Sequence, residues 1–248
     1  MELAGYMKGK NLLGMALATL FLMYSFLILE ESRYEKLDIF LLFLLFLLLL
    51  LTFSKTNIAL VLICFVGLRI NRFNAKLLCV MTVTILVSVF VFFPGIFYVA
   101  GDPADVSMLV SDGFLTGRGI IWSNLYYDLY YFKKAILGYG YGAFFAVGEV
   151  PLFFDDKYSF LRYISSAHNG YLELFIQFGY LLGTFLFVYS VFPALYSKKT
   201  CFLVLIGFVY LHNITESSFL RDQSLIWMLY IYAVVMIFYE KNEGVYTR

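Results

Sequence analysis

Charge is scarce in this chain of 248 residues. Charged side chains make up 14% of it and hydrophobic side chains 62%, and the mean hydropathy is +0.84. Water-soluble domains of this size do not have such a composition, so the sequence predicts a polytopic integral membrane protein. The net charge of +1 gives no electrostatic reason to expect nucleic acid as a partner.

Cysteine is scarce as well. The three cysteines, Cys64, Cys79 and Cys201, lie in apolar runs and have neither disulfide nor metal-site spacing. We expect them to be small buried hydrophobic side chains. The first apolar run lacks a small-residue cleavage site, which favours a membrane span over a cleavable signal peptide.

Apolar runs of membrane-crossing character divide the chain into three segments. A membrane-spanning helix needs about 20 apolar residues, and the run 57–70 is short enough to be a tilted or re-entrant element. We expect N-terminal transmembrane helices in 1–100, a large loop in 101–168 and C-terminal transmembrane helices in 169–248. The predicted fold is all-α, with six or seven spans at about 12–29, 37–53, 57–70, 77–100, 169–192, 201–215 and 224–239.

The positive charges predict which side of the membrane each loop occupies. Lysine and arginine concentrate in the short loops 30–36, 69–76 and 196–200 and in the C-terminal tail, so these are expected to be cytoplasmic. The large loop then lies outside, and a functional site should face outward. Five polar clusters would share that face: 9–11, 54–57, 117–118, 168–169 and 212–217.

The large loop carries a second helical pattern. Apolar residues recur at helical spacing over about 119–136, with several tyrosines among them. This predicts an amphipathic helix at the membrane interface with tyrosines at headgroup depth; a membrane-anchored lid without chemistry is the alternative. The glycine-rich stretch 138–142 is either a mobile loop over a cleft or a plain connector. The polar, aromatic segment 151–163 is a candidate sugar contact.

Polar residues at the edges of the spans are the candidates for chemistry. Ser165 or Ser166 is expected to cap the helix of the following span, which places His168 in its first turn. Glu173 and Gln177 share a helix face, and the carboxylate is expected to pair with a cation.

Two further sets of polar residues have both functional and structural interpretations. His212 and Glu216 form an i,i+4 pair that can steady a cation such as Lys55 or Arg221, or they are polar contacts between helices. Arg118 and Lys55 are the cations best placed to bind an anion, because a guanidinium fork matches phosphate oxygens and an ammonium is a point charge. Their alternative role is snorkelling to lipid headgroups.

Six motifs, in order along most of the chain, resemble those of the O-antigen ligase and polymerase family of membrane glycosyltransferases. They comprise a Lys-Asn-x-x-Gly stretch, a Ser-Arg-Ser/Thr turn, a Gly-Arg motif, a Gly-x-Gly, a His-Asn motif and an Asn-x-Thr-Glu stretch. The matching residues are Lys10-Asn11 with Gly14; Ser54-Lys55-Thr56; Thr116-Gly117-Arg118 with Trp122; Gly138-Tyr139-Gly140; Ala167-His168-Asn169-Gly170-Tyr171-Leu172 with Gly179; and Asn213-Ile214-Thr215-Glu216-Ser217.

The resemblance implies a GT-C-like bundle, here only in part, and an outward-facing active site in the cytoplasmic (inner) membrane. The implied reaction is inverting transfer of a glycan from an undecaprenyl-pyrophosphate carrier to a sugar hydroxyl, without metal or cofactor. Arg118 would stabilise the leaving pyrophosphate, assisted by Lys55, and His168 would be the general base. Asn169, Glu216 and Arg221 are expected to bind the substrate. No Asp-x-Asp motif is present, which fits metal independence.

The chain departs from the family in two ways. It begins where a middle span should start, so it is expected to be a C-terminal portion of the family's length. It also has Lys55 where arginine is common, which weakens bidentate phosphate binding there.

Several functions remain open at this stage. Polymerisation of repeat units is favoured by the Asn-x-Thr-Glu match, and ligation to a lipid core uses the same chemistry. A transporter of lipid-linked sugars would have polar residues at mid-membrane and internal repeats, which the sequence lacks. An inactive remnant is the third possibility. Expected partners are the lipid-linked oligosaccharide, a sugar acceptor and the bilayer, with other membrane proteins of polysaccharide assembly as further candidates.

Overall fold

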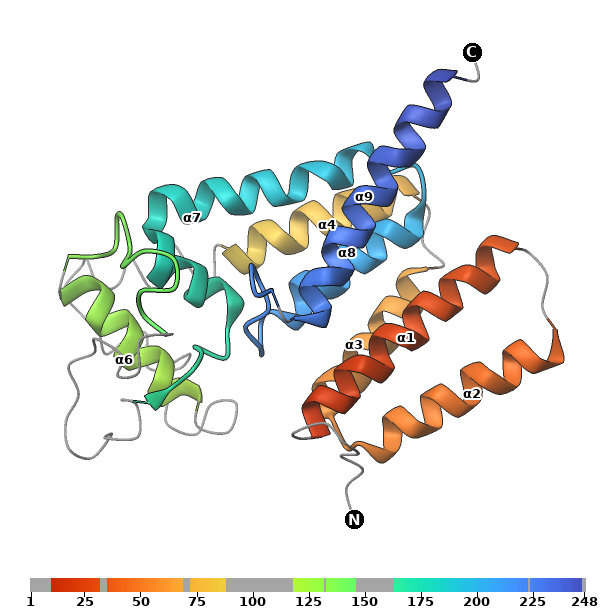
Figure 1. Ribbon diagram of the computed structural model, residues 1–248, viewed down its shortest axis with the longest axis horizontal. Helices are drawn as coiled ribbons and strands as arrows, with labels where there is room; N and C mark the ends of the chain where they lie inside the picture. Colours follow the sequence, from red (N-terminus) through yellow and green to blue (C-terminus); the bar gives the residue numbers. More distant parts are fainter. Residues whose placement is uncertain are drawn as a thin grey trace. The chain divides into compact units, whose positions relative to one another are not determined.

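The computed structural model describes residues 10–31, 35–68, 72–87, 118–131, 133–145, 163–222 and 224–246. Regular structure in these ranges consists of α-helices alone (Figure 1). They are α1 (Lys10–Glu31), α2 (Lys36–Leu51), α3 (Lys55–Gly67), α4 (Arg72–Val87), α6 (Arg118–Tyr131), α7 (Gly170–Tyr196), α8 (Thr200–His212) and α9 (Leu225–Tyr246).

The chain forms two compact units. The first comprises Met1–Val80, Pro193–His212 and Leu220–Arg248, and the second Met81–Phe192 and Asn213–Phe219. Helices α4 and α7 contribute residues to both. This grouping reflects contacts rather than membrane topology, so the segments 1–100, 101–168 and 169–248 stay a prediction.

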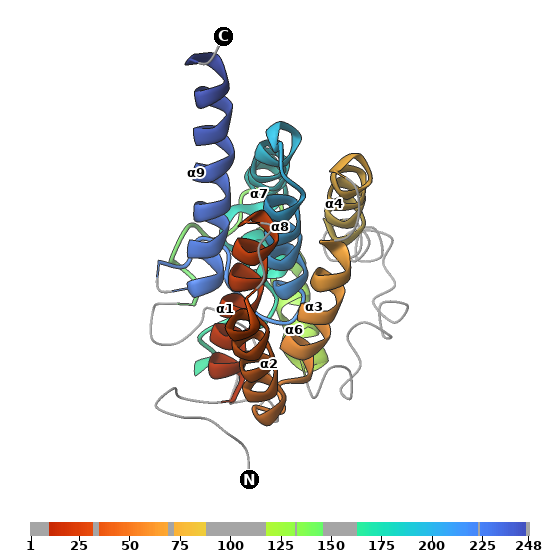
Figure 2. The same cartoon turned by 90° about the vertical axis from the view of Figure 1, so that its right-hand side faces the viewer.

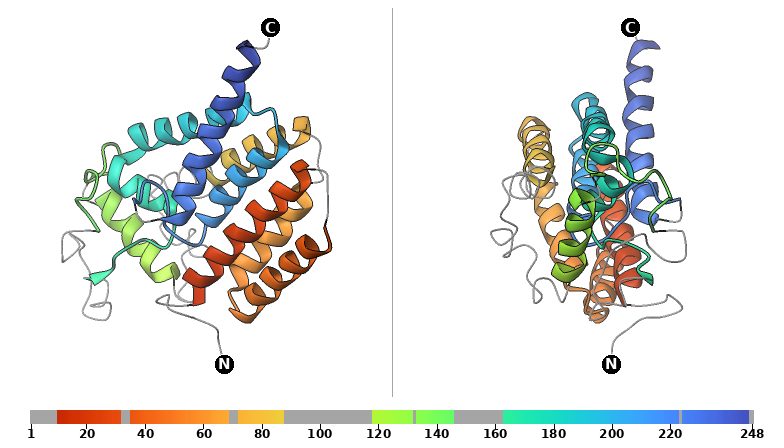
Figure 3. Two further views of the ribbon diagram at one scale, coloured as in Figure 1. Left: turned by 45° about the vertical axis from the view of Figure 1, so that its right-hand side comes forward. Right: turned by 90° about the vertical axis from the view of Figure 1, so that its left-hand side faces the viewer.

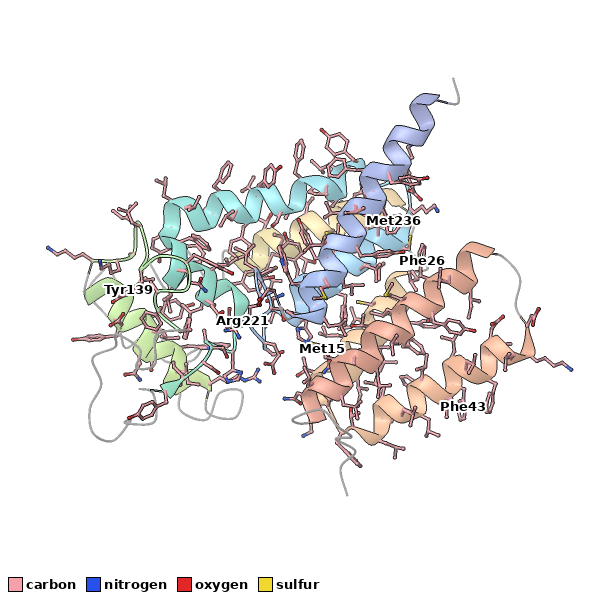
Figure 4. All side chains as sticks on the ribbon, viewed as in Figure 1. Met15, Phe26, Phe43, Tyr139, Arg221 and Met236 are labelled. Atoms are coloured by element: carbon pink, nitrogen blue, oxygen red, sulfur yellow. The ribbon has the colours of Figure 1, made fainter. Side chains whose placement is uncertain are left out.

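In the first unit, α1 packs against α2, α3 and α9, and α8 packs against α3 and α9. Figure 2 shows α1, α2 and α3 grouped together, and Figure 3 shows α8 alongside α9. Phe26 of α1, labelled in Figure 4, contacts Phe202 of α8 with ring centroids 5.5 Å apart. Tyr24 also donates to Asp38 Oδ1 at 2.6 Å, which links α1 to the first turn of α2.

A polar contact joins the starts of α1 and α3. Ser54 Oγ donates to Asn11 Oδ1 at 3.3 Å, and Asn57 Nδ2 lies 2.8 Å from Ser54 Oγ. A Cβ on Gly14 would lie 2.7 Å from Ser54 Cβ, so only glycine permits this approach. Two of the six motifs are therefore packed against each other, and their residue types have a structural explanation.

The second unit contains α6, the loop 133–145, most of α7 and the loop 213–219. Its core is aromatic. Tyr171 stacks on Phe187 with centroids 5.1 Å apart, and Phe219 packs edge-on against both at 5.5 Å. Phe219 thereby holds the loop 213–219 against α7.

Helix α7 is broken at Gly179, whose φ is 68° and ψ −175°. Tyr171 and Phe187 would lie about 24 Å apart along a straight helix, yet their rings stack. The short arm 170–178 therefore folds toward the arm 180–196, and Figure 1 shows the bend in the ribbon. The helix predicted over 169–192 is therefore kinked at Gly179, whose positive φ ends the first arm.

The loop 135–140 hydrogen-bonds to backbone N–H and C=O groups of α7 that have no partner within the helix at this break. Tyr139 N donates to Ile176 O at 2.7 Å and Gly140 N to Gln177 O at 2.8 Å. In the opposite direction, Tyr180 N donates to Ala135 O at 2.7 Å. The glycine-rich stretch thus docks on α7 through its backbone.

Helix α6 is shorter than its apolar pattern indicates. It ends at Tyr131, because Lys133 has a φ of 55° and Lys134 N donates to Leu129 O at 2.9 Å, which is a Schellman-type end. Ile136 is exposed outside the helix. The predicted extension to 136 was therefore wrong. Among the α6 tyrosines whose side chains the structure describes, Tyr126 is buried inside the unit and Tyr127 is exposed. The amphipathic, interfacial character of this helix stays a prediction.

Two helices of the described ranges, through Asn11–Ile28 and Gly170–Tyr196, have the length and apolar composition that membrane crossing requires. Shorter apolar helices occupy Lys55–Gly67, Asn74–Leu86, Thr200–His212 and Leu225–Glu240. A helix occupies most of each predicted span where the structure describes it, but α2 ends at Leu51 and α8 at His212, short of the predicted 53 and 215. Residues 88–100 and most of the large loop, including 101–117 and 151–162, lie outside the described ranges.

Candidate functional site

One carboxylate joins the two residues expected to carry the chemistry. Glu216 Oε1 lies 3.0 Å from Arg118 Nη2, and Glu216 Oε2 lies 3.4 Å from His168 Nδ1. Arg118 begins α6, His168 lies two residues before α7, and Glu216 lies in the loop 213–219, all in the second unit. A guanidinium and an imidazole separated by 49 residues therefore lie side by side.

Arg118 is held from two directions and remains accessible. Besides the Glu216 pair, its Nη1 donates to the backbone carbonyl of Thr215. The Arg118 side chain is 18% exposed. A guanidinium has five N–H donors, so donors remain for an incoming anion. Arg118 is thus a cation paired with Glu216, and the pairing with Lys55 or Arg221 that the sequence suggested stays a prediction.

His168 has an unusual backbone that its neighbours fix. Its φ is 49°, a left-handed conformation that costs about 1–3 kcal/mol for a non-glycine residue. On one side, Ala167 O accepts from Trp122 Nε1 at 2.9 Å and Ala167 N donates to Glu173 Oε2 at 3.2 Å. Such bonds hold the strained residue in place, and the His168 side chain is left 45% exposed.

Asn169 fixes the other side of His168 and begins the helix. Its N–H donates to Ser217 Oγ at 3.1 Å, and its Oδ1 accepts from Leu172 N at 3.0 Å. Asn169 is therefore the N-cap of α7. The expectation that Ser165 or Ser166 caps this helix was wrong, and His168 precedes the first turn instead of lying in it.

Asn169 is fully buried, and its Nδ2 has no hydrogen-bond partner among the described residues. A buried, unpaired amide donor is costly. Its predicted role in substrate binding stays a prediction, and its position beside His168 is compatible with that role.

The close packing of Gly170 accounts for the glycine that follows the His-Asn pair. Gly170 N lies 2.9 Å from Asn213 O and 3.1 Å from Glu216 O. A Cβ on Gly170 would lie 2.1 Å from Asn213 Oδ1, so no other residue fits without displacement. Asn213 Oδ1 accepts from Ser218 N at 2.8 Å, which shapes the loop that presents Glu216. The Gly-Arg, His-Asn and Asn-x-Thr-Glu motifs thus converge on one site.

The remaining predicted residues lie elsewhere or have other partners. Lys55 is exposed at the first position of α3, and Lys55 and Arg221 both belong to the first unit. Their contribution to anion binding stays a prediction. Helix α8 ends at His212, so His212 and Glu216 are not an i,i+4 helical pair. For Glu173, one partner is the Ala167 amide, and its expected pairing with a cation stays a prediction.

Sequence reasoning missed a hydrogen-bonded pair between α6 and the loop that follows it. Tyr139, labelled in Figure 4, donates to Asp128 Oδ2 at 2.5 Å, and Asp128 is buried. Burial raises the pKa of Tyr139 above its ordinary value of 10, and the hydrogen bond and charge of Asp128 raise it further. This hydrogen bond connects α6 to the loop 135–140, which in turn bonds to α7 around Gly179.

Comparisons with protein families, with curated proteins and with solved structures find no match to this chain. The resemblance to the O-antigen ligase and polymerase family therefore rests on the motif residues alone. Within the ranges that the structure describes, no three His, Cys, Asp or Glu side chains cluster as metal ligands. Metal independence of the reaction stays a prediction.

Proposed function

We propose that the protein transfers a glycan from an undecaprenyl-pyrophosphate carrier to a sugar hydroxyl, and so polymerises polysaccharide repeat units. The observation that carries the proposal is the Glu216 carboxylate shared between Arg118 and His168. An accessible guanidinium beside an exposed imidazole suits a reaction that releases an anion and removes a proton.

The reaction is a direct displacement. The acceptor hydroxyl oxygen attacks the anomeric carbon of the donor glycan, and the bond from that carbon to the diphosphate oxygen breaks. The electron pair leaves with the diphosphate, whose growing charge Arg118 stabilises through its remaining N–H donors. The hydroxyl proton passes to the unprotonated ring nitrogen of the neutral His168 imidazole, which acts as the general base. One displacement inverts the anomeric configuration.

A lipid-borne donor requires that the site lie at a membrane, and we propose a multi-pass protein of the inner membrane with this site facing outward. The large exposed side chains of α2 support a lipid environment. Leu37, Ile39, Phe40 and Phe43 are each more than half exposed, and Phe43 is labelled in Figure 4. A helix that is apolar on all sides needs a hydrophobic surrounding.

Cells that make the lipid-linked repeat unit and depend on this chain for polymer provide the test. We expect Arg118→Ala and His168→Ala to abolish polymer while lipid-linked repeat still accumulates on the outer leaflet. Arg118→Lys retains the charge but not the fork and should retain partial activity. Accumulation on the inner leaflet instead would favour a transporter. Polymer in both alanine variants would exclude the proposed reaction.

A further inference from the structure

The two nitrogens of the His168 ring have different environments. Nδ1 faces Glu216 Oε2 at 3.4 Å. An ionised carboxylate only accepts hydrogen bonds, so Nδ1 carries the hydrogen in this arrangement. In the neutral imidazole Nε2 is then the unprotonated nitrogen, which is the one able to take a proton.

The carboxylate is itself fixed independently of His168. Glu216 Oε1 is held by Arg118 Nη2 at 3.0 Å, and the Glu216 backbone carbonyl lies 3.1 Å from Gly170 N. Because Arg118 can only donate, the oxygen facing it must be an acceptor. Arg118 therefore fixes the orientation of the Glu216 side chain, and the atom at its second terminal position, Oε2, is the one that faces His168.

We propose that Glu216 is a positioning residue: it fixes the His168 tautomer with Nδ1 protonated, so that Nε2 is the base. This differs from the substrate-binding role that the sequence suggested. The role of Nε2 as a base rests on the proposed glycan transfer, whereas the tautomer is a property of the folded chain alone.

The isosteric variant Glu216→Gln tests this directly. The amide oxygen is expected to turn toward Arg118, which donates, and the amide NH₂ is then presented to Nδ1. Because an NH₂ group donates, His168 should switch to the Nε2–H tautomer, with Nδ1 unprotonated. Size and hydrogen bonding are retained, so the variant is expected to fold. Glu240→Gln is the control, because Glu240 pairs with Lys199 at 2.7 Å in the other unit.

Nitrogen NMR of the protein labelled at histidine reads out the tautomer without any activity assay. The chain has two histidines, and His168→Gln assigns the signal of His168. We expect an Nδ1–H tautomer for neutral His168 in the wild type and in Glu240→Gln, and an Nε2–H tautomer in Glu216→Gln. An Nε2–H tautomer in the wild type, or the same tautomer in Glu216→Gln, would overturn the positioning role.

The turnover number gives a second, separable readout. With the wrong tautomer the base is lost, so Glu216→Gln should lower kcat on the order of 10²-fold or more. Little further loss is expected when the substitution is added to His168→Gln. If the tautomers are as expected but His168→Gln is fully active, glycan transfer by this site is refuted. If the wild type or Glu216→Gln has the other tautomer while His168→Gln has lost activity, only the role of Glu216 is refuted.

Discussion

Replacing Gly179 by alanine should destabilise the second unit far more than an ordinary glycine substitution. The residue has a φ of +68° and a ψ of −175°, a region essentially confined to glycine that costs about 1–3 kcal/mol for alanine. The added Cβ would lie 2.2 Å from Ile136 O, whereas ordinary contacts begin at 3.4 Å. The loop must therefore move by at least 1.2 Å, the difference between these two distances.

That movement would break the hydrogen bonds from Tyr180 and Leu181 to the loop carbonyls. Each contributes about 0.5–1.5 kcal/mol, so with the backbone strain the total loss is roughly 2–6 kcal/mol. Gly142 is the matched control: its φ is +69°, and nothing lies within 4 Å of its added Cβ. Gly142→Ala should therefore lose only the strain of about 1–2 kcal/mol.

The assay is equilibrium unfolding of each variant in the same detergent, with hydrogen exchange to locate the change. Faster exchange at the amides of Tyr139, Gly140 and Tyr180 is expected in Gly179→Ala and not in Gly142→Ala. Equal losses of stability in the two variants would refute the tight docking of the loop on the α7 break.

Three other substitutions test contacts around the site. Asn169→Ala should destabilise the protein by about 1 kcal/mol through loss of the helix cap, whereas Asn169→Asp should retain the cap, as measured by denaturant unfolding. Trp122→Phe leaves the buried Ala167 carbonyl without its donor, and should cost about 1–3 kcal/mol and lower activity; unchanged stability would contradict this. Since the pKa of Tyr139 is raised by folding, its contribution to stability is complete below pH 10 and is lost at higher pH. Tyr139→Phe, which removes the bond to Asp128, should flatten the alkaline fall in the free energy of unfolding.

The sequence predicted the helices and the approximate contents of the site. Apolar runs long enough for helices are visible directly, and the described helices coincide with them. Arg118 and His168 were expected to meet because both were placed at the outer edge of the spans, and the structure brings them together through Glu216. Their roles stay a proposal.

The errors arose where several residues of similar propensity compete. Ser165, Ser166 and Asn169 are all good helix caps, and only the docking of Asn169 against Ser217 decides among them. The break at Gly179 lies inside an apolar run that satisfies the composition of a span. Its cause is a partner loop that begins more than 30 residues earlier in the chain, and hydrophobic periodicity contains no information on that contact.

The most direct test of the central claim is the release of undecaprenyl diphosphate by the purified chain in lipid vesicles supplied with the lipid-linked glycan. We expect one diphosphate released for each glycosidic bond that the wild type forms. Turnover should fall on the order of 10²-fold in His168→Gln and in Arg118→Ala. Release at the wild-type rate by both variants would contradict the assignment of this site.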